Sequence, residues 1–345
     1  MKKIAIFDSG VETPEEIIIA AGFTPYRLFG DPTIQVDKAN EHIPPTHCLW
    51  TRNLLEQALR GLNKDIEGLI AAHGCDRTNR EFDIWHECLN LKFKYFLNTP
   101  LKRNEIALKF FINDIKELIL QLESTFDLKI NDNKIKAAIV KTNKIRRLLK
   151  ELSEYRTKNV LLGSEFHRLV KKALQLEKDK TLNSLSSELE KLDEKSPLKL
   201  NNKKRVLLTG SDIDDTEFLV FLEDLGFHIV IDDLCVGTKY FWHEIDEKEE
   251  PIKALAKYHL EKPIYSTKFP SYDRFDFLKK LTQTYKVNGV INVAQKFCEP
   301  VLYDHPYLNK KFKELEIPYL FVEVTYNRES YKQLSTRFSA FAEMI

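Results

Sequence analysis

Short apolar runs alternate with amphipathic segments in the first and last thirds of the chain. Residues 206–208 form one such run, which ends near Gly210, and the following apolar positions recur at helical spacing up to Gly226. A second run follows at residues 228–231. Because a strand, a loop and a helix repeat in this order, the pattern predicts an α/β fold with parallel sheets.

The same alternation predicts the other elements at both ends of the chain. Strands are expected at residues 24–28, 68–72, 92–97, 206–208, 228–231, 289–293 and 317–322. Helices are expected at residues 14–21, 76–90, 218–225, 252–260, 272–285, 306–315 and 330–345, with another that carries Leu54, Leu55, Ala58 and Leu59. An extended crossing is expected at residues 263–270.

The middle of the chain lacks this alternation. Its apolar residues fall into two helical stripes, one from Ile112 to Leu122 and one from Ile145 to Leu152, and the opposite faces are rich in Lys and Glu. The sequence therefore predicts three parts: an α/β lobe at residues 1–100, a helical segment at 101–200 and a second α/β lobe at 201–345.

Composition and charge narrow the function classes. The 345 residues carry a formal net charge of +1, with 43% hydrophobic and 30% charged residues, so we expect neither a nucleic-acid surface nor a membrane surface. No apolar run is long enough for a membrane span, and the start does not resemble a signal peptide, which favours a cytoplasmic protein. Five widely spaced cysteines fit a reducing compartment rather than a disulfide framework.

Four cysteines stand where an α/β protein places ligands. Cys75, Cys235 and Cys298 each follow a predicted strand, at the edge of the sheet where open α/β folds bind their ligands. Cys48 lies near a predicted helix start, where a thiolate is favoured. Soft thiolates of this kind are the usual protein ligands of iron–sulfur clusters. Cys88 lies within a predicted helix and is assigned to packing.

Other polar residues near these thiols have simpler interpretations. Asp76 and Asp233 are expected to cap helices, although either could orient the backbone near a cluster. The turn at residues 210–212 is expected to be a strand-to-helix turn with a capping side chain, the alternative being a phosphate site. His47 and His73 flank two thiols and are expected to be hydrogen-bonding loop residues, with proton donation as the alternative. Neither a G-x-G-x-x-G motif nor a P-loop occurs.

Several short motifs follow one another along nearly the whole chain. They are residues 13–18 (TPEEII) with 21–27 (AGFTPYR), 74–76 (GCD), 232–238 (DDLCVGT), 295–298 (QKFC) and 333–337 (QLSTR). In this order and spacing they resemble the 2-hydroxyacyl-CoA dehydratase family of D-component-like proteins, which also includes the small subunits of ATP-dependent benzoyl-CoA reductase.

The resemblance implies a fold, a cofactor and a set of ligands. It implies two flavodoxin-like lobes with helices between them, and a [4Fe-4S] cluster near their interface held by three cysteines. The four candidates are Cys48, Cys75, Cys235 and Cys298. Cys235 and Cys298 rank highest, and the third ligand is expected to be Cys48 or Cys75.

The resemblance also implies a reaction and partners. An ATP-dependent iron–sulfur activator would supply an electron to an acyl-CoA thioester, which forms a ketyl radical and then either loses a hydroxyl group or begins ring reduction. The chain lacks a cysteine that many relatives carry at the stretch matching residues 263–265, so a homologous second subunit, or a second copy, is expected to complete the enzyme. The alternative is a non-catalytic electron-relay subunit.

Overall fold

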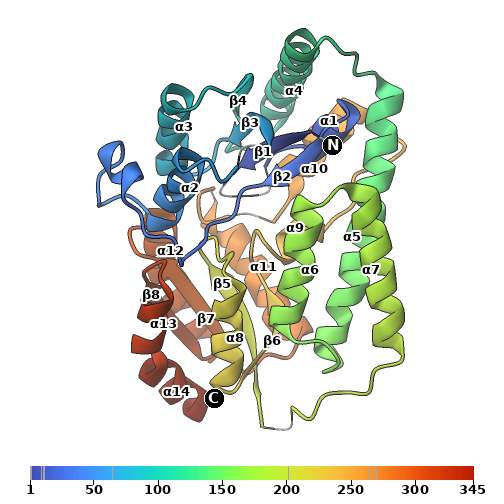
Figure 1. The fold of residues 1–345 in the computed structure, drawn as a ribbon. Coiled ribbons are helices and arrows are strands. Elements are labelled where there is room, and N and C mark those ends of the chain that lie inside the picture. Colours follow the sequence, from blue (N-terminus) through green and yellow to red (C-terminus); the bar gives the residue numbers. More distant parts are fainter. Residues whose placement is uncertain are drawn as a thin grey trace.

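Two four-stranded parallel sheets form the framework of the protein (Figure 1). The computed structural model describes residues 2–8, 10, 12–63, 65–200, 202–263, 265–268 and 270–345. The strands are β1 (Lys3–Phe7), β2 (Thr24–Arg27), β3 (Ile66–Ala72) and β4 (Phe93–Leu97) in the first sheet, and β5 (Lys204–Gly210), β6 (Phe227–Asp232), β7 (Gly289–Gln295) and β8 (Tyr319–Val324) in the second. The orders β2-β1-β3-β4 and β6-β5-β7-β8 are equivalent, and each is the order that begins a flavodoxin-like sheet. The predicted α/β fold with two such lobes is confirmed.

Helices surround these sheets and fill the space beside them. They are α1 (Glu15–Ala20), α2 (Leu49–Leu59), α3 (Asp76–Cys88), α4 (Glu105–Phe126), α5 (Asp132–Thr157), α6 (Gly163–Gln175), α7 (Lys178–Asp193), α8 (Thr216–Asp224), α9 (Thr238–Phe241), α10 (Pro251–Glu261), α11 (Ser271–Thr284), α12 (Glu299–Glu314), α13 (Arg328–Gln333) and α14 (Ser335–Met344), with a short 3-10 turn at Lys38–Glu41. In Figure 1, α5, α6 and α7 run together along one flank of the molecule. No helix of the described part is both long and apolar enough to cross a bilayer.

Each sheet is covered on both faces, which explains its near-continuous apolar strands. On the first sheet, Ile70 belongs to the core that includes α4 and α10, whereas Leu69 belongs to the core that includes α2 and α3. On the second sheet, Ile291 likewise belongs to the core on one face and Val290 to the core on the other. Parallel sheets bury both faces because their crossover helices lie on both sides.

A buried ion pair joins the helical segment to the first lobe. Glu16 on α1 accepts from Arg146 on α5 at 2.6 Å, and Thr142 donates to the same carboxylate at 2.8 Å. Burial alone would raise the pKa of Glu16, but the charge of Arg146 and the hydrogen bonds to the carboxylate together outweigh it, and the pKa is lowered. This pair connects α1 to α5.

The structure corrects several predicted elements. Strand β1 lies inside the first sheet, between β2 and β3, but was not expected, because its four apolar residues end abruptly at Asp8. Helix α12 begins at Glu299 rather than at Pro306, since Pro300 occupies the first turn, where its missing N–H costs nothing, and Pro306 is accommodated inside the helix.

The crossing expected at residues 263–270 is described only in part. Residues 264 and 269 lie outside the described residues. Residues 265–268 form a turn, in which Lys268 N donates to Tyr265 O at 3.1 Å.

Candidate functional site

Three cysteines occupy the same local position at the start of a helix. Cys48, Cys75 and Cys298 are the residues immediately before α2, α3 and α12, and none of them caps its helix through the side chain. The first N–H groups of a helix lack intrahelical partners and carry partial positive charge. Each of these thiols therefore lies where a thiolate ligand is electrostatically favoured.

The order of the strands distinguishes the thiols that follow them. Cys75 follows β3, which pairs with β1, and Cys298 follows β7, which pairs with β5. In each sheet the paired strands, β1 with β3 and β5 with β7, are followed by connections that run toward opposite edges of the sheet. Open α/β sheets bind ligands in the crevice between two such strands. Cys235 instead follows β6, the edge strand of its sheet.

Arg77 joins the segments that carry the three helix-start thiols. It lies two residues after Cys75, and its guanidinium donates at 2.7 Å both to the carbonyl of Thr46 and to the carboxylate of Glu299. Thr46 is two residues before Cys48, and Glu299 directly follows Cys298. A single side chain thus holds together loops from both lobes at the site.

The three thiols also influence one another electrostatically. Burial raises the pKa of Cys48, and the neighbouring Cys298 and Cys75 add to the shift. Burial likewise raises the pKa of Cys298 to about 11, against a hydrogen bond from Ser211 and with a further contribution from Cys75. Without a ligand these two thiols stay protonated at neutral pH, and bringing their sulfurs together as thiolates requires a positive charge between them.

Cys235 belongs to a different environment. It is buried in the core formed by α5, α6 and α7. Burial raises its pKa, the charge of Asp212 raises it further, and Lys239 and Arg27 oppose both effects. Asp212 accepts a hydrogen bond from this thiol and also raises the pKa of Cys298. Cys235 does not line the hollow that Cys75 lines.

The expected caps are not the residues that the structure uses. Asp76 is the first residue of α3, and its side chain does not cap that helix. Asp233 is a buried ionic centre that accepts from Arg274 at 2.7 Å, Lys239 at 2.8 Å and Thr209 at 2.9 Å. The turn after β5 is capped by Asp215, which accepts from Glu217 N at 3.3 Å. The expected capping roles were therefore wrong. For Asp233 the reason is that the tertiary fold brings Arg274 and Lys239 to its carboxylate, which the local sequence does not reveal.

The two flanking histidines differ in their surroundings. His47 pairs with the buried Glu81 at 3.4 Å. His73 lines the opening beside Cys75, and its ring contacts Phe96 edge-on. Within the described ranges, its Nδ1 has no hydrogen-bond partner.

Asp214 joins the two lobes beside the Cys48 helix. Its carboxylate accepts from Trp50 Nε1 at 2.7 Å, Gly30 N at 2.7 Å and Tyr326 Oη at 2.6 Å. Trp50 follows Cys48 by two residues on α2, whereas Asp214 lies in the second lobe. Neither Asp214 nor Arg77 was identified from the sequence, since only their position between the lobes distinguishes them.

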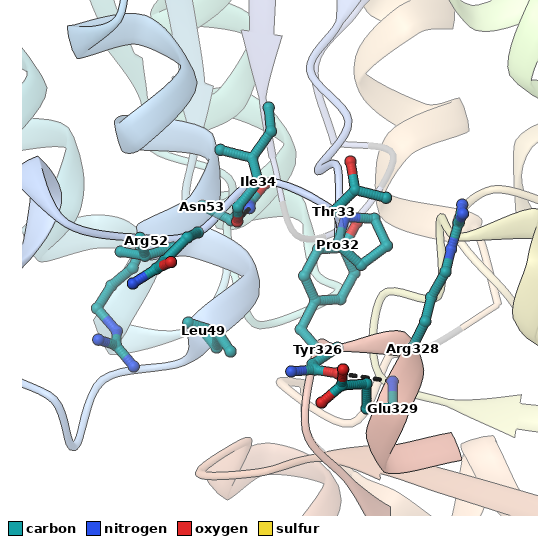
Figure 2. A pocket seen from close by; sticks show the side chains of 12 residues that line it. Pro32, Thr33, Ile34, Leu49, Arg52, Asn53, Tyr326, Arg328 and Glu329 are labelled. Carbon is teal, nitrogen blue, oxygen red and sulfur yellow. Dashed lines mark hydrogen bonds between the residues drawn. The ribbon is translucent and has the colours of Figure 1, made fainter. Parts of the chain in front are cut away.

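Two hollows adjoin this site. One, of about 320 Å3, is lined by Cys75, Arg77, Glu299 and Tyr303 among others. The other, of about 590 Å3, lies between α2 and the loop that precedes α13; Figure 2 shows Leu49, the residue after Cys48, among its lining side chains. The thiol site therefore has an opening beside Cys75, and the larger hollow lies beside the start of α2.

Cys88 lies apart from the four candidates. It is the last residue of α3 rather than mid-helix, and its sulfur lies 3.6 Å from His42 Nδ1. All five cysteines are free thiols.

Comparison with known proteins gives one consistent match. The family model "2-hydroxyglutaryl-CoA dehydratase, D-component" matches residues 11–345. The chain is 25% identical to the (R)-phenyllactyl-CoA dehydratase beta subunit of Clostridium sporogenes, over 96% of this chain and 89% of that protein. It is 23% identical to the lactoyl-CoA dehydratase beta subunit of Anaerotignum propionicum (97% and 90%) and to a subunit of the benzoyl-CoA reductase of Thauera aromatica (97% and 89%).

Proposed function

The chain belongs to the 2-hydroxyglutaryl-CoA dehydratase D-component family, and from this we propose that it is the iron–sulfur subunit of a 2-hydroxyacyl-CoA dehydratase or a related acyl-CoA reductase. The relatives above are named as subunits of enzymes that act on phenyllactyl-CoA, lactoyl-CoA and benzoyl-CoA. The substrate is accordingly an acyl-CoA thioester. The enzyme includes a second subunit, and a reducing cytoplasm suits its thiols.

Cys48, Cys75 and Cys298 are the proposed ligands of a [4Fe-4S] cluster. The observation that carries this proposal is the attachment of their three segments to Arg77, at the starts of three helices. The donor chemistry fits, because three free thiols are soft ligands suited to iron–sulfur clusters. No group of three or more His, Cys, Asp or Glu side chains in the described ranges is arranged for a single metal ion; a cluster is wider than one ion, so its ligands stand farther apart.

This ligand set differs from the ranking that the sequence suggested. Cys235 ranked with Cys298 because both follow strands, but Cys235 packs in the helical core beside Asp212. We therefore leave it out of the ligand set and assign it the role of a buried thiol whose hydrogen bond helps to hold Asp212.

When bound, the cluster would supply single-electron reduction of the thioester carbonyl. The chain itself binds it through the three thiols, and Arg77 keeps the loops of both lobes at a fixed separation. Cys48 is buried, which keeps water from its sulfur, whereas Cys298 is half-buried. The hollow lined by Cys75 is the proposed approach for the acyl end, because it opens directly beside a ligand. Coupling to ATP is assigned to a separate activator, since the chain has no P-loop.

Anaerobic production followed by iron and sulfide analysis tests the cofactor. We expect about four irons per chain and loss of most of that iron in Cys48→Ser, Cys75→Ser and Cys298→Ser. Cys235→Ser and Cys88→Ser serve as controls and should keep it. A stable, colourless, iron-free wild-type protein would contradict the cofactor, and loss of iron in Cys235→Ser with retention in Cys48→Ser would contradict the ligand set.

Turnover tests the catalytic role. With its partner subunit, an activator, ATP and a strong reductant, the protein should convert a 2-hydroxyacyl-CoA or an aromatic acyl-CoA. Activity without ATP would exclude the mechanism. Inactivity in every pairing, with the cluster intact, would favour the electron-relay alternative.

A further inference from the structure

Arg52 differs from the other buried arginines in having no acidic partner. Five arginines are buried in the described part of the chain. Four of them pair with a carboxylate at 2.6–3.4 Å: Arg27 with Asp212, Arg146 with Glu16, Arg156 with Asp232 and Arg274 with Asp233. Arg52 is 8% exposed and forms no ion pair within the described ranges. Because a buried charge without a counter-charge is costly, Arg52 calls for an anion that the protein's own carboxylates do not supply.

The hydrogen bonds of Arg52 go to neutral oxygens. Its Nη1 donates to Asn40 Oδ1 at 2.6 Å and its Nη2 to Pro45 O at 3.3 Å. Its Nε is buried and has no hydrogen-bond partner in the described part of the chain. The guanidinium therefore keeps its full charge, and one donor, beside the loop that leads to Cys48.

Helix α2 places this charge next to Cys48. The amide of Arg52 donates to the carbonyl of Cys48 at 3.2 Å, so the two residues lie one helical turn apart. Side chains on a helix lean toward its amino-terminal end, and the bond to Pro45 shows that this guanidinium does so. Burial lowers the pKa of Arg52, and a Cys48 thiolate opposes this shift more strongly than Glu81 does. The negative charge that acts most strongly on Arg52 is thus that of a proposed cluster ligand.

The other charged residues near the thiols are already paired. Arg77 pairs with Glu299 at 2.7 Å. Glu81 pairs with His47 at 3.4 Å and also accepts from Trp85 Nε1 at 3.1 Å. Arg52 is therefore the unpaired cation beside the three thiols in the part of the chain that the structure describes.

An anion in the larger hollow explains Arg52 less well. Arg52 and Arg328 both line that hollow, but Arg328 pairs with Asp215 at 3.1 Å. In Figure 2 the guanidinium of Arg52 lies on the opposite side of the hollow from Arg328. The two cations therefore do not converge on one point, as the binding of a phosphate or carboxylate group between them would require.

We propose that Arg52 is the counter-charge of the iron–sulfur cluster and raises its reduction potential; the proposal rests on the function proposed above. Three thiolates give the bound cluster an excess of negative charge, and an added electron increases it. A fixed cation in a poorly solvated position stabilises the reduced state more than the oxidised state. Arg52 therefore favours transfer of one electron from an external reductant, in which the reductant is oxidised and no bond forms or breaks.

A redox titration of the anaerobically purified chain, with dithionite as the reductant and EPR detection, tests this role. At a fixed potential, Arg52→Gln should lower the ratio of reduced to oxidised cluster about tenfold, which is a shift of the midpoint by about −59 mV for a one-electron couple. Arg52→Lys keeps the charge but loses the planar fork of donors, and should change the ratio less than about threefold. Arg80→Gln is the control and should also change it less than about threefold, because Arg80 is exposed on α3 and its charge is screened.

The outcomes separate charge from loop structure. Equal shifts in Arg52→Gln and Arg52→Lys would assign the effect to the hydrogen bonds with the loop and would overturn the proposal. An unchanged potential in iron-loaded Arg52→Gln, or loss of iron from both variants, would overturn it as well. Loss of iron from Arg52→Gln alone would support it, because the charge would then be needed to hold the cluster. An iron-free wild-type protein would refute the cofactor and this role together, whereas an unshifted Arg52→Gln beside an iron-loaded wild type would refute this role alone.

Discussion

Replacing Asp214 by alanine tests whether this residue joins the two lobes. Its carboxylate accepts three hydrogen bonds of 2.6–2.7 Å, and two of the donors, Trp50 and Tyr326, are only 4% and 3% exposed. Burial raises the pKa of Asp214, so removing the carboxyl group also recovers some desolvation energy. Without the carboxylate, the buried Trp50 Nε1 and Tyr326 Oη lose their acceptor.

The magnitude follows from those donors. Each buried donor without an acceptor costs about 1–3 kcal/mol. Counting Trp50 and Tyr326 fully and the half-buried Gly30 amide in part, and subtracting the recovered desolvation, we expect Asp214→Ala to lower the free energy of unfolding by about 3–5 kcal/mol. Asp214→Asn keeps one accepting oxygen and should lose about 1–2 kcal/mol.

Urea unfolding followed by tryptophan fluorescence measures this change, because Trp50 itself reports on the junction. Asp83→Ala is the matched control, since Asp83 pairs with the exposed Arg80 on the surface. Its unfolding midpoint should not move. A loss below about 1 kcal/mol for Asp214→Ala would show that water or a rearranged side chain satisfies the donors, and would refute the argument.

Three further predictions concern other parts of the fold. Arg77→Gln should lower the iron bound per chain while leaving the thermal midpoint of the iron-free protein nearly unchanged, and full iron content would contradict its role in holding the thiol loops. Gly210→Ala should lower the free energy of unfolding by more than about 3 kcal/mol, since a Cβ would lie 1.9 Å from the Val293 carbonyl oxygen at a φ of +139°. Its control is Gly226→Ala, where φ is +94° and a Cβ would meet nothing within 4 Å. Thermal unfolding should show a loss of only about 1 kcal/mol for this control. Burial, aided by Lys171, lowers the pKa of His167 to about 3. The stability that the neutral ring contributes is therefore complete above its ordinary pKa of 6.5 and is lost as the pH falls toward 3; at pH 5 the loss is about 2 kcal/mol. His167→Gln should flatten the dependence of the free energy of unfolding on pH, measured by urea titrations. An unchanged pH dependence would contradict this prediction.

The sequence by itself determined the local elements and the kind of chemistry. Apolar runs followed by amphipathic segments predicted seven of the eight strands, because the two periodicities are local properties of the chain. The placement of Cys75, Cys235 and Cys298 after strands was also readable, since a strand's carboxyl end is set by its own residues. The order of the short motifs along the chain indicated the family in the same way, because it too is a property of the linear sequence.

Only the tertiary structure distinguished the thiols that follow central strands from the thiol that follows an edge strand. Which strand lies at the centre of a sheet depends on pairing between distant segments, and a short run such as β1 carries little local signal. That pairing places Cys75 and Cys298 beside the central strands and Cys235 at an edge. The same cause explains why Arg77 and Asp214 were missed: their partners lie up to 222 residues away in sequence, so no periodicity records them. The proposed ligand set comes from three distant segments, so it depends on the packed lobes, whose hydrophobic faces bring those segments together.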